Sequence, residues 1–227
     1  MSFDLLPARG GGTALAVVAG TAEVLARPEL DASLLEPWEH ERLARIRVPS
    51  RRDDVLAARL LLRLCLARFT GGPLRTQAPA QSCATCGRSG HGRPFLPGRP
   101  EVGISMSHAD GLAAAAVGPG PVGIDVEPAA RRPGPLPVLR RMLPGAETEL
   151  AQAAALPEPG PALLRVWVRH EARLKAGGGA GLRVLTWTDR GRAAVAAVAS
   201  AAPAAVAPAL SPSLTGARAG AAAGGRG

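Results

Sequence analysis

Hydrophobic and polar positions follow one another along this chain in patterns that separate helices from strands. The clearest helical pattern covers residues 50–69, where apolar side chains recur at helical spacing with arginines between them and Ser50 is placed to cap the start. A second long helix is predicted over 161–176, because the glycine-rich stretch after it is a strong stop signal. Shorter helical segments are predicted at 33–46, with Ser33 as the N-cap, and at 136–157.

Short apolar stretches bounded by glycine and proline predict the strands. The segment 101–118 has the pattern of a β-hairpin, with its turn at 109–111. Single strands are predicted at 13–19, 122–126 and 182–189, while 70–100 is rich in glycine and proline and is expected to be mostly loop. After residue 193 the chain becomes rich in alanine and glycine, which allows one strand and predicts disorder for the rest.

Composition narrows the class of protein. With 227 residues, 47% of them hydrophobic, the chain can bury a real core, but only 3% are aromatic, so that core must be aliphatic. A formal net charge of +9 favours acidic partners. Three cysteines give no disulfide framework, no apolar run is long enough to span a membrane, and no secretory signal is evident. We therefore expect a cytoplasmic protein that does not bind a membrane.

Two carboxylates stand two positions apart in the strand sequence GIDVE. Asp125 and Glu127 point to the same face if the strand includes both of them. Their mutual repulsion then calls for a cation, and a hard divalent ion with oxygen ligands, such as Mg²⁺, is the economical choice. The alternative is that the strand ends at Val126 and that Glu127 is simply solvated.

The second long helix carries the only lysine of the chain. Glu171 and Lys175 are four residues apart and therefore share a face of that helix, with Trp167 and Leu174 close enough to seat it against the core. On its own this pair could be an ordinary surface ion pair. Together with the strand carboxylates, it could instead face a metal ion and a phosphate.

The hairpin carries Ser105, Ser107, His108 and Asp110, which resemble the members of a hydrolytic triad only in type. Residues this close together on one strand and turn cannot converge as nucleophile, base and orienting acid do. A serine and a histidine at a strand end are better suited to hold a phosphate. Arg93, which precedes a rigid proline, is a further candidate for a phosphate clamp.

A loop sequence, CATCGRSGH, places Cys83, Cys86 and His91 close together. This spacing suggests a zinc site, although a fourth ligand is missing locally, and reduced thiols without a metal are the default interpretation. Cys65 lies within the first long helix and is expected in the core.

Four of these motifs occur in an order that resembles one enzyme family. Along the chain stand GRPFL, ISMSHADG, VGIDVE and WVRHEARLK followed by GAGL, which together are similar to the pattern of 4'-phosphopantetheinyl transferases of the surfactin-synthetase-activating type. The resemblance covers about residues 40–185. It implies an α+β fold made of a pseudo-two-fold pair of similar subdomains, each with a small antiparallel sheet packed on a long helix, and an active site at their interface. The implied division is 1–117, 118–192 and an Ala/Gly-rich tail over 193–227.

The resemblance also implies an activity and its residues. Such enzymes move 4'-phosphopantetheine from coenzyme A to a serine hydroxyl of an acyl or peptidyl carrier protein and release adenosine 3',5'-bisphosphate. Since a single pseudo-two-fold chain builds its own cleft, we expect a monomer, with no nucleic-acid partner. The implied Mg²⁺ ligands are Asp125, Glu127 and Glu171; the catalytic residues are Glu171 as proton acceptor and Lys175; the coenzyme A contacts are Arg93, Ser107, His108 and Lys175, with Arg52 and Arg59 as less specific helpers.

Two other interpretations remain open. His170 stands where the family has a lysine, and Ser105 where asparagine is usual, so the chain could be a degenerate relative that binds without turnover. The basic composition and the CxxC motif would also suit a nucleic-acid-binding protein with a zinc-stabilised loop, although aromatic residues for base stacking are scarce.

Overall fold

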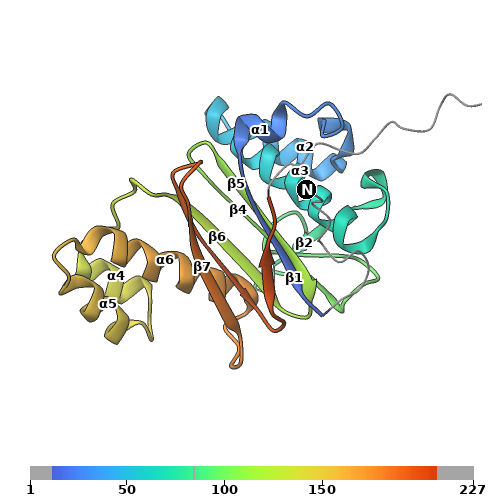
Figure 1. The fold of residues 1–227 in the computed structure, drawn as a ribbon. Coiled ribbons are helices and arrows are strands. Elements are labelled where there is room, and N and C mark those ends of the chain that lie inside the picture. Colours follow the sequence, from blue (N-terminus) through green and yellow to red (C-terminus); the bar gives the residue numbers. More distant parts are fainter. Residues whose placement is uncertain (1–11, 84, 209–227) are drawn as a thin grey trace, which may run out of the picture.

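The computed structural model describes residues 12–83 and 85–208 of the chain (Figure 1). Its first part contains β1 (Ala14–Gly20), α1 (Thr21–Leu25), α2 (Pro37–Ala44), α3 (Pro49–Thr70), β2 (Ala80–Ser82), β3 (Arg93–Phe95), β4 (Val102–Ala109) and β5 (Leu112–Pro119). The second part contains β6 (Val122–Pro128), α4 (Leu136–Met142), α5 (Glu147–Ala154), α6 (Pro159–Ala176), β7 (Arg183–Asp189), β8 (Ala194–Ser200) and β9 (Ala204–Val206). No described helix is long and apolar enough to cross a membrane.

Two sheets form the centre of the molecule. The first has the strand order β4-β5-β1-β9, and the second has the order β6-β8-β7. All pairings are antiparallel except that of β1 with β9, which is parallel. Strands β2 and β3 form a separate short ribbon. The observed α+β class agrees with the sequence prediction, whereas the two-fold relation between the halves stays a prediction.

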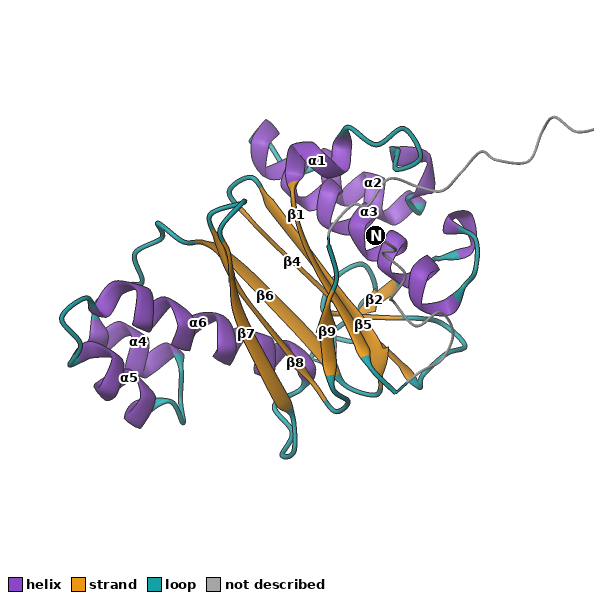
Figure 2. Ribbon diagram, viewed as in Figure 1, coloured by secondary structure: helices purple, strands orange, loops and turns teal. Residues whose placement is uncertain are grey.

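Helices lie on the outer sides of the strands (Figure 2), and the alternation of side chains along the strands builds a layered core. On β5, Ala114 and Ala116 pack against the second sheet, while Ala113 and Ala115 pack toward α3. On β8, the corresponding alternation puts one set of small side chains between the sheets and the other against α6. Each sheet therefore has one long helix on its outer face. Alanine allows the sheets to approach closely, which explains how a chain so poor in aromatics fills its interior.

Helix starts differ from the sequence prediction. The predicted caps Ser33 and Ser50 were wrong, because α2 begins at Pro37 after Glu36, and α3 begins at Pro49. Proline at the first helical position has its backbone already set for a helix and lacks an N–H that would go unpaired there. That preference, rather than a serine cap, fixes both starts. The end of α6 at a left-handed Gly177 is as predicted.

The alanine-rich C-terminal region contributes to both sheets. β8 is buried along its whole length and pairs with β6 on one side and β7 on the other, so a boundary at residue 192 would divide one sheet. β9 then returns to the first sheet beside β1. The sequence allowed for one strand here; the second was missed. Residues 209–227 of the predicted disordered tail lie outside the described part.

A buried cluster of three charges joins α2 to α3. Glu39 is fully buried and accepts hydrogen bonds from Arg59 Nη1 at 2.5 Å and from Arg63. It also accepts from the backbone N–H of Glu36 at 2.8 Å, so the same carboxylate holds the first turn of α2. Burying these charges is tolerable only because each is paired, and removing one partner leaves the others without compensation.

Replacing Glu39 with Gln should therefore lower the free energy of unfolding by about 3–5 kcal/mol, because two buried guanidinium groups lose their counter-charge. Urea denaturation measures the loss. Glu41→Gln on the same helix is the matched control, since its 3.8 Å pair with Arg45 is exposed and should contribute little. Equal stability of the two variants would show that the buried cluster is not needed to join α2 to α3.

Candidate active site

A large cleft opens where the ribbon β2–β3 and strand β4 meet β6 and α6. Its volume is about 1490 Å³, larger than the roughly 300–1,000 Å³ of most small-molecule sites. Most of its wall comes from the first half of the chain, and Asp125, Leu174 and Lys175 contribute from the second. Leu174 does not seat α6 against the core as predicted: its side chain is 62% exposed at the cleft.

The cleft is strongly basic. Asp125 is the one acidic residue among those that line it, against seven basic ones: Arg42, Arg45, Arg47, Arg51, Arg59, Arg93 and Lys175. Side chains of one sign facing a common space attract a ligand of the opposite sign. Such a lining suits a ligand that carries several phosphates.

Three polar side chains meet where β4, β6 and α6 come together. Lys175 Nζ donates to Asp125 Oδ1 at 2.7 Å and to Ser107 Oγ at 2.9 Å, and Ser107 Oγ donates to Asp125 Oδ1 at 2.8 Å. The Asp125 side chain is nearly buried, whereas that of Lys175 is 30% exposed. The lysine thus neutralises the carboxylate and still reaches the cleft.

The position of Lys175 depends on how closely α6 crosses β6. A Cβ atom on Gly123 would lie 2.1 Å from Ala172 O and 2.4 Å from Ala176 N, which no side chain can do. Gly123 therefore lets the backbone of α6 rest directly on the strand. Asp125 follows Gly123 by two residues and therefore lies on the same face of β6. The close contact at Gly123 thus brings the last turn of α6 over Asp125.

Strand β6 presents both predicted carboxylates to α6. Asp125 and Glu127 are buried on the same face of the strand, as expected, and Glu127 pairs with Arg131. Burial raises the pKa of Glu127, an effect that Arg131 partly offsets. Burial also raises the pKa of Glu171, and the charge of Asp125 raises it further. Asp125 is therefore close enough to repel both Glu127 and Glu171.

Their oxygens are nevertheless not gathered as tightly as a ligand set. Among the described residues, the one group of three metal-ligating side chains whose atoms all lie within 4.8 Å is Cys83, Cys86 and His91. The sharing of one ion by all three acids stays a prediction. Asp125 Oδ2 and Glu127 Oε2 are, however, buried without a hydrogen-bond partner in the described structure. A buried acceptor without a donor is costly, so these two oxygens suit a cation.

Arg93 and His108 both line the cleft, as predicted for phosphate contacts. The guanidinium of Arg93 lies against the end of α6, where a Cβ on Gly177 would be 3.0 Å from its Nη1. Although His108 is an exposed residue, partial desolvation by its neighbours lowers its pKa; nearby cations lower it further, and Asp54 opposes them. His108 is thus mainly neutral at pH 7, and can donate one hydrogen bond.

The two arginines of α3 have different surroundings. Arg59 lines the cleft, but its Nη1 is held by Glu39, its Nη2 donates to Gln81 at 3.1 Å, and its guanidinium lies 4.9 Å from the Trp38 ring centre. It therefore shapes the wall more than it offers free donors. Arg52 is exposed and does not line the cleft, whereas its neighbour Arg51 does.

Several contributors were not predicted from the sequence. Ser105 Oγ accepts the N–H of Ile124 at 3.1 Å and so links the edge strands of the two sheets. Arg131, in the loop after β6, pairs with Glu127 and lies over the Trp167 ring at 5.6 Å. Arg42, Arg45 and Arg47, which line the cleft before α3, were also missed, since the sequence showed only a general abundance of arginine.

In a comparison with protein families, residues 121–207 fit the model of the 4'-phosphopantetheinyl transferase superfamily. The matched segment begins just before β6 and ends after β9, and it includes Asp125, Glu171 and Lys175. A search of curated proteins gave no significant match.

Replacing Gly123 with Ala should push α6 away from β6, because the new methyl group would collide with helix backbone rather than with a flexible side chain. We expect a loss of about 1–3 kcal/mol in unfolding free energy and faster hydrogen exchange of α6 amides. Gly134→Ala is the control, since its nearest neighbour would be a Val138 methyl at 3.9 Å. Unchanged α6 exchange in Gly123→Ala would refute the close contact as the determinant of α6 position.

Proposed function

We propose that this protein is a 4'-phosphopantetheinyl transferase, which moves phosphopantetheine from coenzyme A to a serine hydroxyl of an acyl or peptidyl carrier protein. The observation that carries the proposal is the placement of the family-matched segment: it supplies Asp125, Leu174 and Lys175 to a large basic cleft whose remaining wall comes from outside the match. Adenosine 3',5'-bisphosphate would be the second product.

The cleft suits coenzyme A in charge and in size. Its lining offers arginines from two sides, Arg51 at the start of α3 and Arg93 on β3, to the phosphate groups. The ammonium of Lys175 has three N–H donors, of which Ser107 and Asp125 take two, so one is left for a phosphate oxygen. Neutral His108 adds a further donor nearby.

Asp125, Glu127 and Glu171 would hold Mg²⁺. The partnerless buried oxygens of Asp125 and Glu127 support this assignment, and Glu171 shares their electrostatic environment. When bound, the ion would offset negative charge on the diphosphate of coenzyme A. Carboxylate oxygens are the donors that this hard cation prefers.

The chain's own residues account for the rest of the chemistry. The serine oxygen of the carrier forms a bond to the phosphorus that bears pantetheine, and the bond from this phosphorus to the bridging diphosphate oxygen breaks. The serine proton passes to Glu171, whose raised pKa makes it a better acceptor than an ordinary carboxylate. Lys175 and Arg93 fix the phosphates, since phosphoryl transfer depends mainly on positioning and charge.

The partner would approach a positively charged protein. The net charge of +9 attracts acidic carrier proteins and speeds their encounter. Both halves of this chain supply walls of the cleft, and we propose that the enzyme works as a monomer.

The test is to incubate the full-length protein with coenzyme A, Mg²⁺ and several apo carrier proteins, and to weigh the carriers by mass spectrometry. We expect a gain of one phosphopantetheine group. A chelator should stop the reaction, and Mg²⁺ but not Zn²⁺ should restore it. Asp125→Asn and Glu171→Gln should each reduce the rate by about 10²-fold or more.

Glu149→Gln is the matched control for Glu171→Gln, because Glu149 is a partly exposed α5 residue that pairs with Arg169 at 3.4 Å, away from the cleft. It should retain the wild-type rate. Coenzyme A binding without any mass gain on several carriers would identify a binding protein without turnover and would defeat the proposed activity.

A further inference from the structure

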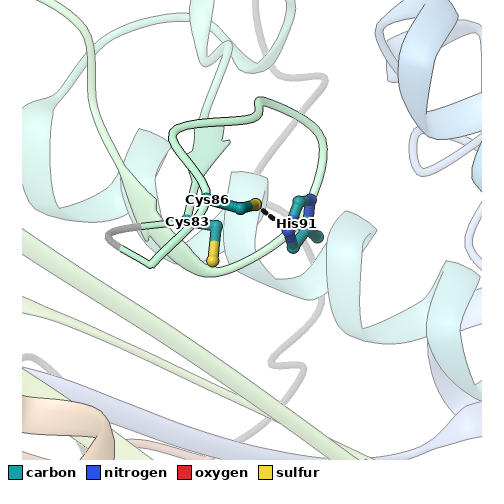
Figure 3. Close-up of side chains that lie close together, drawn as sticks. All are labelled: Cys83, Cys86 and His91. Carbon is teal, nitrogen blue, oxygen red and sulfur yellow. Dashed lines mark hydrogen bonds between the residues drawn. The ribbon is translucent and has the colours of Figure 1, made fainter.

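A second cluster of chemically active side chains lies beside the cleft, in the connection between β2 and β3. Cys83 directly follows β2, and Cys86 and His91 belong to the loop that leads to β3 (Figure 3). The ligand atoms of the three residues all lie within 4.8 Å of one another, and Cys86 Sγ is 3.1 Å from His91 Nε2. The sequence placed these residues near each other; the fold turns them toward one point.

The loop is held by hydrogen bonds rather than by an apolar core. Residues 85–89 are exposed, and the strands that the loop joins have three residues each, too few to be stable as an isolated ribbon. Yet the chain is tightly turned: Gly87 N–H donates to Cys83 O at 2.8 Å, and Cys83 N–H donates to Arg88 O at 3.0 Å. A small exposed segment without an apolar core commonly needs a covalent or metal cross-link.

The turn also prepares one sulfur as a ligand. The backbone N–H groups of Cys86 and Thr85 donate to the Cys83 sulfur. Hydrogen bonds of this kind favour the thiolate, which is the form that binds a metal. Cys65, by contrast, is buried in α3, where burial raises its pKa to about 12.

We propose that Cys83, Cys86 and His91 bind one Zn²⁺ ion, with water as the fourth ligand. Two sulfurs and an imidazole nitrogen are a preferred zinc donor set. With metal–ligand distances of about 2.0–2.3 Å, tetrahedral ligands lie roughly 3.3–3.8 Å apart, so the observed cluster needs only small adjustments.

The bound ion would hold the β2–β3 ribbon against the cleft. Arg93 stands two residues after His91, and Gln81, which contacts Arg59, stands two before Cys83. Gly92 joins the loop to β3 with a positive φ of 88°, and a Cβ there would lie 2.2 Å from Ser82 O. Zinc would therefore act as a structural cross-link that fixes the place of Arg93 in the cleft wall.

The test is the metal content of the full-length protein, purified under reducing conditions and measured by elemental mass spectrometry. We expect about one zinc per chain after gel filtration. Replacing zinc with Co²⁺ should produce thiolate-to-cobalt charge-transfer absorption and the visible bands of a tetrahedral site. These measurements need no enzymatic activity. A protein without zinc would therefore not count against the proposed transfer reaction, and a protein without transfer activity would not count against the zinc site.

Cys83→Ser, Cys86→Ser and His91→Ala should each lose stoichiometric zinc, whereas Cys65→Ala should keep it; circular dichroism checks that each variant is folded. Cobalt titration of the wild-type protein keeps the test decisive if a variant fails to fold. Absence of both zinc and the cobalt bands from the reduced wild type would overturn the proposal. A Cys83–Cys86 disulfide in place of metal, or full zinc retention by all three cluster variants, would overturn it equally.

Discussion

The crossing of α6 over β6 at Gly123 is the constraint on which the rest of the site depends. Because the strand has no side chain there, helix backbone lies directly on it, and the next inward-facing residue, Asp125, meets the last turn of the helix. Ser105 and Ser107 of β4 then tie this strand to the other sheet through Ile124 and Asp125. The close contact at Gly123 and the hydrogen bonds from β4 thus bring α6, β6 and β4 together at the edge of the cleft.

Charge balance explains why this point can be both stable and reactive. Asp125 is nearly buried and is neutralised by Lys175, which remains partly exposed. The carboxylate therefore lies in the interior, while the ammonium group can still contact a ligand. Burial raises the pKa of Glu127 and Glu171, and the charge of Asp125 adds to this effect, while buried oxygens of Asp125 and Glu127 have no hydrogen-bond partner and suit a cation. Around them the cleft is lined by arginine. Negative charge in the centre and positive charge at the rim is the arrangement that binding a phosphate ester together with a metal ion requires.

The sequence predicted the regular elements well because their signals are local. The periodicity of α3, the stop at Gly177 and the shared face of Asp125 and Glu127 each follow from a few neighbouring residues. What it missed depends on contacts across the fold. No local signal marks Glu39 as the partner of two arginines, Ser105 as a link between sheets, or β9 as a neighbour of β1. The pairing of two of the three predicted carboxylates with Lys175 and Arg131 was missed for the same reason, since only the folded structure shows it.

The most direct measurement is a crystal structure of the protein with coenzyme A and Mn²⁺ in place of Mg²⁺, with the ion located by its anomalous scattering. Our account predicts one manganese peak on Asp125, with carboxylate oxygen from Glu127 or Glu171 beside it, and the diphosphate between that ion, Lys175 and Arg93. Coenzyme A bound outside the cleft, or manganese bound away from Asp125, would contradict it.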